Sequence, residues 1–181
     1  MAKHAALSDI MGAHHGMNWH NRRFFYNPVT SRLEPIGFDA DIYPELLPIS
    51  YLYLNLPMWG DRMGFHMYSG QGSFNYLLWS DYVFFERYLH FLEKFSQPSY
   101  LENLFNTIHK ELDKNLSIIH KDAPYYSYRS SLFYENQDYI RKLLYPTKGI
   151  RAYQNEFNKN RIQLEVGNLH NLPMELLYIS Y

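Results

Sequence analysis

The sequence contains no cysteine, no long apolar run and no marked surplus of charge of either sign. Without cysteine there is no disulfide, no thiolate zinc site and no cysteine nucleophile. No run approaches the roughly 18 apolar residues of a membrane-spanning helix, and the first residues lack the basic-then-apolar layout of a signal peptide. The 17 Lys and Arg against 18 Asp and Glu give a formal net charge of -1. A nucleic-acid partner is therefore not expected, because that expectation rests on a basic surplus.

These absences name no compartment, and a parent protein that is exported or displayed at the cell surface stays open. The composition does indicate a folded chain. Its 181 residues are 46% hydrophobic and 18% aromatic, with 18 tyrosines. That is enough for one ordinary domain with a packed core. Because buried tyrosines need partners for their hydroxyl groups, we expect a core with many hydrogen bonds.

The first part of the chain predicts a helix followed by a β-hairpin. Apolar spacing predicts a helix over residues 3–15, ended by Gly16. Residues 22–27 and 33–38 flank a turn-forming segment and predict two paired strands. From Asp39 to Gly72 prolines and glycines interrupt the chain, which predicts extended loop with short helical turns.

The rest of the chain predicts helices and then strands. Helices are expected from about residue 73 to 95, over 99–120 and over 131–144, and strands over 162–166 and 176–179. The fold class is therefore α+β and mainly helical. We expect one helical domain over 1–147, and over 148–181 the start of a C-terminal β module that needs further strands to be stable.

The hairpin predicts a cation site. If its strands pair, Asn21 and Asp39 lie just outside the two ends, at about 5 Å between Cα atoms. An amide oxygen and a carboxylate that meet beside the second carboxylate of Asp41 suit a hard cation such as Mg²⁺. The alternative is structural: Asp39 and Asp41 would cap the following turn, and Asn21 would satisfy a strand end.

Residues 20–28 (HNRRFFYNP) and 33–41 (LEPIGFDAD) resemble the CotH kinase family. These atypical, protein-kinase-like enzymes carry an N-Y-Y-L-Y-like stretch, a turn, and a P-W-D-x-D-like motif. The resemblance covers about residues 5–45 and implies a kinase-like C-terminal lobe, without the N-terminal lobe of the family. It implies that Asn21 and Asp39 bind Mg²⁺ on ATP phosphates, supported by Asp41, and that the parent protein transfers phosphate to a protein hydroxyl.

One position departs from the family pattern. A catalytic aspartate is expected five residues before the asparagine, as in the H-R-D-L-x-x-x-N loop. That position holds Gly16. His15 or His20 could act as the base instead, because imidazole titrates near neutral pH. The alternative is a pseudokinase-like module that binds or serves as a scaffold without catalysis.

The three histidines near the motif, His14, His15 and His20, also raise the question of a zinc site. Neighbouring residues on a helix point about 100° apart, so His14 and His15 are not expected to share one ion. No H-E-x-x-H spacing occurs. Structural roles for these histidines, or contact with a substrate, are favoured over zinc.

Overall fold

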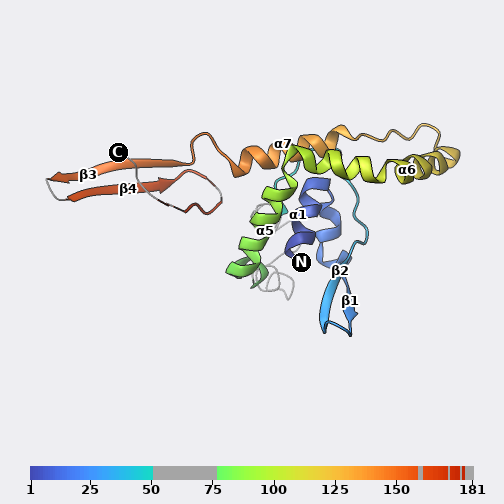
Figure 1. Ribbon diagram of the computed structural model, residues 1–181, viewed down its shortest axis with the longest axis horizontal. Helices are drawn as coiled ribbons and strands as arrows, with labels where there is room; N and C mark the ends of the chain where they lie inside the picture. The colour runs from blue at the N-terminus through green and yellow to red at the C-terminus, as the bar shows by residue number, and fades with distance from the viewer. Residues whose placement is uncertain (51–76, 159–160, 171, 176, 178–181) are drawn as a thin grey trace. The chain divides into compact units, whose positions relative to one another are not determined.

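The computed structural model describes residues 1–50, 77–158, 161–170, 172–175 and 177. The protein is an α+β chain, mainly helical, with an N-terminal helix, a β-hairpin and C-terminal strands, as predicted (Figure 1). It falls into two compact units, residues 1–141 and residues 142–181. No helix in the described ranges is long and apolar enough to cross a membrane.

The first helix, α1 (Ala2–Met11), is shorter than predicted. The expectation that it runs to residue 15 was wrong, because Gly12 ends it at a left-handed φ of 63°. The backbone N–H groups of Gly12 and Ala13 cap the carbonyls of Asp9 and Ser8. The next residues form two 3₁₀ turns, η1 (His14–Met17) and η2 (Trp19–Asn21).

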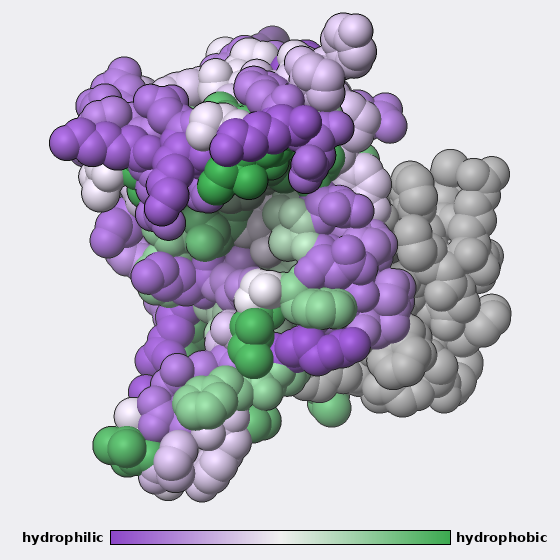
Figure 2. Space-filling model, turned by 90° about the vertical axis from the view of Figure 1, so that its right-hand side faces the viewer, coloured by the Kyte–Doolittle hydropathy of each residue, from purple (hydrophilic) through white to green (hydrophobic). Residues whose placement is uncertain are grey.

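The hairpin follows directly, as the sequence predicted. Strand β1 (Arg23–Asn27) pairs antiparallel with β2 (Arg32–Ile36), in a register that joins Arg23 to Ile36. In Figure 2 the hairpin forms the lowest part of the surface, where apolar side chains lie beside hydrophilic ones. Residues 39–49 have no regular structure, as predicted, and residue 50 is helical. Residues 51–72 of the predicted loop lie outside the described residues.

Three longer helices complete the first unit. Residues 77–80 are helical. Helix α5 (Tyr82–Phe95) begins after Asp81, whose carboxylate accepts a hydrogen bond from the N–H of Phe84 at 2.6 Å. The predicted helix start at 73 lies outside the described residues. Helices α6 (Pro98–Asp122) and α7 (Ser131–Leu144) match their predicted ranges to within two residues.

The core lies where α1 packs against α5 (Figure 1). The buried residues of α1 include three alanines, whose small side chains allow a close approach, and those of α5 are large. The indole of Trp79 packs edge-on against the ring of Tyr88, with 4.9 Å between centroids. The buried apolar residues of α1 and α5 are Ala2, Ala5, Ala6, Ile10, Tyr88, Leu92 and Phe95.

Helix α7 is tied to the junction between α5 and α6. The side-chain amide of Gln137 donates hydrogen bonds to the carbonyls of Phe95 and Gln97, at 2.9 and 2.8 Å. Carbonyls at the C-terminal end of a helix have no partner in the helix itself, so the bond to Phe95 satisfies one at the end of α5. The bond to Gln97 joins α7 to the residue that precedes α6.

The second unit contains strands β3 (Ile150–Asn158) and β4 (Arg161–Asn168), paired antiparallel. The predicted strand at 162–166 lies inside β4. The predicted strand at 176–179 falls almost wholly outside the described residues, and Leu177, which is described, is not in a strand.

Burial of His4 predicts an acid-sensitive stability. Its pKa is lowered from 6.5 by burial first, and then by the charges of the N-terminal amine and Arg22. The unfolded chain therefore binds this proton more readily than the folded chain. We expect the melting temperature to be highest above the usual histidine pKa and to fall as the pH drops below about 6.5.

The check is thermal unfolding of the protein and of His4→Gln at about pH 7.5 and about pH 5.5, on either side of the histidine pKa. Glutamine cannot take up the proton, so His4→Gln should lose a smaller part of its melting temperature on acidification. An equal loss in both proteins would contradict a contribution from His4.

Candidate functional site

The candidate site lies where η1, η2 and the segment after β2 meet. The short turns are held by backbone hydrogen bonds: the carbonyl of Asn18 accepts from the N–H groups of Asn21 and Arg22, at 2.9 and 3.1 Å. Arg23 adds a further link, because its guanidinium donates to the carbonyl of His20 at 2.7 Å and lies 4.9 Å above the ring of Phe38. This loop therefore places residues 15–21 beside residues 38–41.

His15 stands between the two residues that the sequence predicted to meet. Its Nδ1 lies 3.2 Å from the amide nitrogen of Asn21, 3.0 Å from the carbonyl oxygen of Asp39 and 3.4 Å from a carboxylate oxygen of Asp39. The Asn21 amide also donates to the carbonyl of His15 at 3.0 Å. Asn21 and Asp39 therefore both contact the His15 ring, Asn21 through its amide nitrogen and Asp39 through its backbone carbonyl at the shorter distance. Because one ring nitrogen either donates or accepts, Nδ1 bonds to Asp39 in one tautomer and to Asn21 in the other. The sequence predicted instead that the amide oxygen of Asn21 and the carboxylate of Asp39 meet.

A carboxylate-rich cluster follows from this placement. One possible ligand atom from each of His15, Asp39 and Asp41 lies within 4.8 Å of the other two. Asp39 and Asp41 are exposed, and the His15 side chain is 30% exposed. Two carboxylates and one imidazole nitrogen that are open to solvent can bind a divalent cation. A hard cation such as Mg²⁺ prefers the carboxylate oxygens, and a borderline cation also accepts the imidazole nitrogen.

Asn21 lies behind this cluster. It is 4% exposed, and its amide nitrogen is engaged by His15. The ring of His20, an exposed residue, lies 5.9 Å from the ring of His15 in an edge-on arrangement. The sequence analysis named His15 as a candidate base and disfavoured a zinc site with His14 and His20; it did not predict that His15 lies with Asp39 and Asp41. The signal for that role is its proximity to Asp39, which depends on the turn at η1.

The space that a side chain at position 16 would need, where the family pattern has the catalytic aspartate, is occupied by residues 38–40. Gly16 is buried, and a Cβ atom there would lie 3.1 Å from the carbonyl oxygen of Phe38 and 3.2 Å from the Cβ of Ala40. The segment that carries Asp39 passes directly over Gly16. A side chain at this position would push against that segment.

Comparisons of the chain with protein-family models, with curated proteins and with solved structures found no match. Function therefore has to be argued from the residues themselves.

Asp9, a further carboxylate that precedes the η1 turn in the sequence, is buried inside the first unit. It is 2% exposed and accepts hydrogen bonds from Ser50 N at 2.8 Å, Ser50 Oγ at 2.5 Å and the Tyr88 hydroxyl at 2.5 Å. His14 Nε2 lies 3.1 Å from the same carboxylate. Although α1 ends early enough to leave Asp9 near its C-terminus, Asp9 is a buried structural acceptor and does not reach the cluster.

His14 and His15 accordingly face different partners. His14 lies beside the buried Asp9, and His15 lies beside the exposed Asp39. The expectation that the two neighbouring histidines do not share one ligand therefore agrees with the geometry, although they lie in a 3₁₀ turn and not in a helix as predicted.

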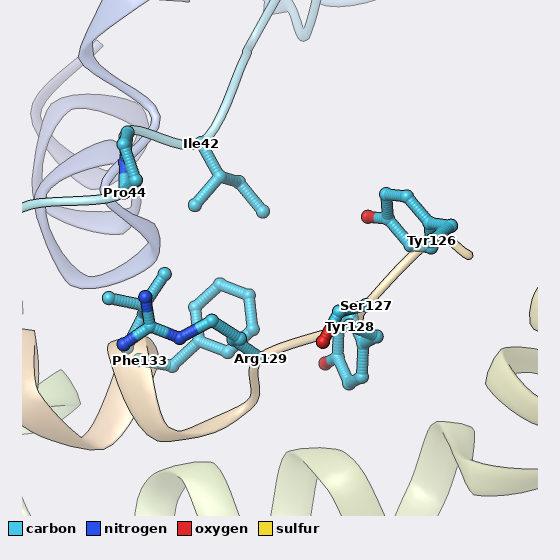
Figure 3. A pocket seen from close by; sticks show the side chains of 8 residues that line it. Ile42, Pro44, Tyr126, Ser127, Tyr128, Arg129 and Phe133 are labelled. Carbon is cyan, nitrogen blue, oxygen red and sulfur yellow. The ribbon is translucent and has the colours of Figure 1, made fainter.

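A pocket of about 190 Å³ begins one residue beyond Asp41. Figure 3 shows Ile42 and Pro44 on one side of it, and Tyr126, Tyr128, Arg129 and Phe133 on the other. The pKa of the Tyr128 hydroxyl is raised by burial first, and then by the neighbouring tyrosines. This hydroxyl therefore remains a neutral donor, and Arg129, Ser127 and Tyr126 supply further polar groups to the pocket wall.

Proposed function

We propose that this chain is a divergent CotH-type, kinase-like lobe that binds Mg²⁺ and ATP, and whose parent protein transfers a phosphoryl group to a protein hydroxyl. The observation that carries the proposal is the cluster in which one possible ligand atom from each of His15, Asp39 and Asp41 lies within 4.8 Å of the other two. Asn21 lies beside it, with its amide nitrogen 3.2 Å from His15 Nδ1. Asn21 and Asp39 match the metal-binding positions of the family motif, and the proposal needs both of them at this place.

In this proposal Asp39 and Asp41 bind the cation directly. Mg²⁺ usually takes one or two carboxylates and completes its shell with water and phosphate oxygens. Both side chains are exposed, which leaves room for those further ligands. The third ligand atom is an imidazole nitrogen. Mn²⁺ is therefore a useful second probe, because it accepts nitrogen ligands more readily than Mg²⁺ does.

The remaining residues of the site have supporting roles. Asn21 fixes the ring of His15 through its amide. Because His15 lies among the possible ligand atoms and its Nδ1 lies within hydrogen-bond distance of Asn21 and Asp39, His20, which is exposed and adjacent, is the better of the two candidates for a general base. The pocket beyond Asp41 could hold a side chain of the protein substrate, with Arg129 offering a donor for an acidic group.

The direct test is a thermal shift of the protein with Mg²⁺ and ATP, repeated with Mn²⁺. Ligand at 100 times its dissociation constant should raise the free energy of unfolding by about 2.7 kcal/mol. Asp39→Asn should remove most of this shift, because it removes a charged ligand. The matched control is Asp113→Asn on the exposed face of α6, which should leave the shift intact. No shift, or one that survives Asp39→Asn, would overturn the proposal.

Asn21→Ala separates a role in binding from a role in folding. We expect weaker Mg²⁺-dependent ATP binding while the fold persists, because His15 loses the amide that orients it. Two hydrogen bonds are lost, each contributing about 0.5–1.5 kcal/mol, so the melting temperature should fall moderately. Global unfolding of Asn21→Ala would mean that Asn21 is structural, and unchanged ATP affinity would mean that it plays no part in binding.

A second candidate function, binding without catalysis, is favoured by one observation. The family position for the catalytic carboxylate is Gly16, closely covered by the backbone of residues 38–40. Incubation with radiolabelled ATP and Mg²⁺ distinguishes the two candidates. Transfer of label to protein, lost in His20→Ala, supports the enzyme. Mg²⁺-dependent ATP binding with no transfer supports the pseudokinase-like module.

A further inference from the structure

The hairpin of β3 and β4 has one apolar face that is open to solvent. Cross-strand partners share a face of the sheet. The register places Ala152 opposite Val166 and Phe157 opposite Ile162. A bulge at residue 155 keeps Phe157 on the same side as Ala152, where simple alternation would turn it to the other side. The apolar residues of this face are Ile150, Ala152, Phe157, Ile162, Leu164 and Val166, and all are exposed.

The two edges of this hairpin differ. Among the residues that the structure describes, β3 and β4 form a sheet of only two strands, so each has a free edge (Figure 1). Strand β3 is interrupted by its bulge, a feature that hinders pairing with another strand. Strand β4 is regular over Arg161–Asn168 and contains no proline. Its edge is therefore the one suited to accept a further strand.

The charges along β4 select the strand that would fit this edge. On the polar face of β4 the order is Arg161, Gln163, Glu165, positive at one end and negative at the other. Two copies of β4 side by side and antiparallel, with a two-fold axis at Gln163, place each Arg161 opposite Glu165 of the other copy. An axis at Glu165 would instead set two carboxylates against each other, which is unfavourable.

We propose that this chain forms a homodimer through antiparallel pairing of β4 with β4 of a second copy, centred on Gln163. The result is a four-stranded sheet with two interstrand ion pairs. An isologous contact of this kind is closed, because each copy offers the same surface. Four strands also exceed the three needed for a stable sheet with an apolar face, whereas an isolated two-stranded hairpin is marginal.

The test is the molar mass of the whole chain in solution, measured by light scattering over a wide range of concentrations. The protein is expected to have twice the mass of one chain, and Glu165→Arg to be monomeric, because it sets Arg161 against a second arginine. The double variant Arg161→Glu/Glu165→Arg reverses both charges and should restore the dimer. An equal mixture of Arg161→Glu and Glu165→Arg should form a mixed dimer, while each alone remains monomeric.

The matched control is Glu156→Arg, which makes the same charge change on the same polar face of the hairpin, but on the bulged strand β3. It should leave the dimer intact. Circular dichroism of each variant checks that the fold is retained. A monomeric wild-type protein at every concentration would overturn the proposal, and so would a dimer that Glu165→Arg does not dissociate.

Discussion

Asp9→Ala is expected to lower the free energy of unfolding by about 3–5 kcal/mol, the range for removal of one partner from a buried charged network. The Asp9 carboxylate accepts three hydrogen bonds, from Ser50 N, Ser50 Oγ and the Tyr88 hydroxyl, and His14 lies beside it. Asp9, Ser50, Tyr88 and His14 are each at most 3% exposed. Removing the carboxylate leaves buried donors that water cannot reach, which is the costly case.

Two further variants, Tyr88→Phe and Asp113→Ala, show whether the loss of stability comes from the Asp9 network. Tyr88→Phe removes one donor but keeps the carboxylate, so it should cost less, about 1.5–3 kcal/mol for a bond to a charged group. Asp113→Ala changes an exposed carboxylate of α6 and should stay within about 0.5 kcal/mol of the wild type. Urea unfolding measures the free energy of unfolding of all three variants, with one common value for its dependence on urea concentration. A loss for Asp9→Ala no larger than for Asp113→Ala would contradict the network.

The same network explains why the sequence did not reveal the role of Asp9. Ser50 lies 41 residues and Tyr88 lies 79 residues from Asp9 along the chain. No local pattern connects residues so far apart. The packing of α1 against α5 brings Tyr88 to Asp9, and the segment that ends at Ser50 supplies the other two donors. The sequence could predict that a tyrosine-rich core contains many hydrogen bonds, but not which carboxylate would accept them.

Local signals did predict the hairpin and the two helices after α5. Helix α6 has Pro98 in its first turn, where proline is favoured, and α7 ends just before Pro146. The end of α1 was missed for a related reason. Both Gly12 and Gly16 could end a helix, and the apolar spacing continued to His14. The helix ends at Gly12, which has a left-handed φ, and the spacing of apolar residues does not predict this backbone conformation.

The candidate site was predicted in part. The hairpin motif identified Asn21, Asp39 and Asp41, because strand pairing is a local geometric rule. The place of His15 between Asn21 and Asp39 follows from the two 3₁₀ turns. The predicted helix over residues 3–15 included the start of the first turn, and no structure was predicted for residues 17–21. On a helix, His15 would follow the direction of α1, and its contact with Asp39 could not have been derived.

Gly16→Ala is expected to lower the stability of the first unit and to disturb the proposed binding of a cation at Asp39. The added Cβ would lie 3.1 Å from the Phe38 carbonyl and 3.3 Å from the Cα of Ala40. Such contacts with backbone are relieved only if the segment moves, and overpacking of this kind costs about 1–3 kcal/mol. Because Asp39 lies between the two contacted residues, its distance from His15 should change as well.

The matched control is Gly37→Ala. A Cβ at Gly37 would meet nothing within 4 Å, although Gly37 lies in the same segment and also loses the freedom of glycine. Gly37→Ala should therefore keep both the melting temperature and the Mg²⁺- or Mn²⁺-dependent shift, while Gly16→Ala lowers both. Equal behaviour of the two variants would mean that the close approach at Gly16 does not position Asp39.

Gly16→Asp extends this comparison to catalysis. It places a carboxylate at the position where the CotH family resemblance expects one, yet the side chain must start from the same crowded Cβ. We expect Gly16→Asp to gain no phosphoryl transfer, because any shift that admits the new carboxylate also displaces the segment that carries Asp39. Transfer activity gained by Gly16→Asp, with cation binding retained, would show instead that the site has lost only one catalytic group and is otherwise competent.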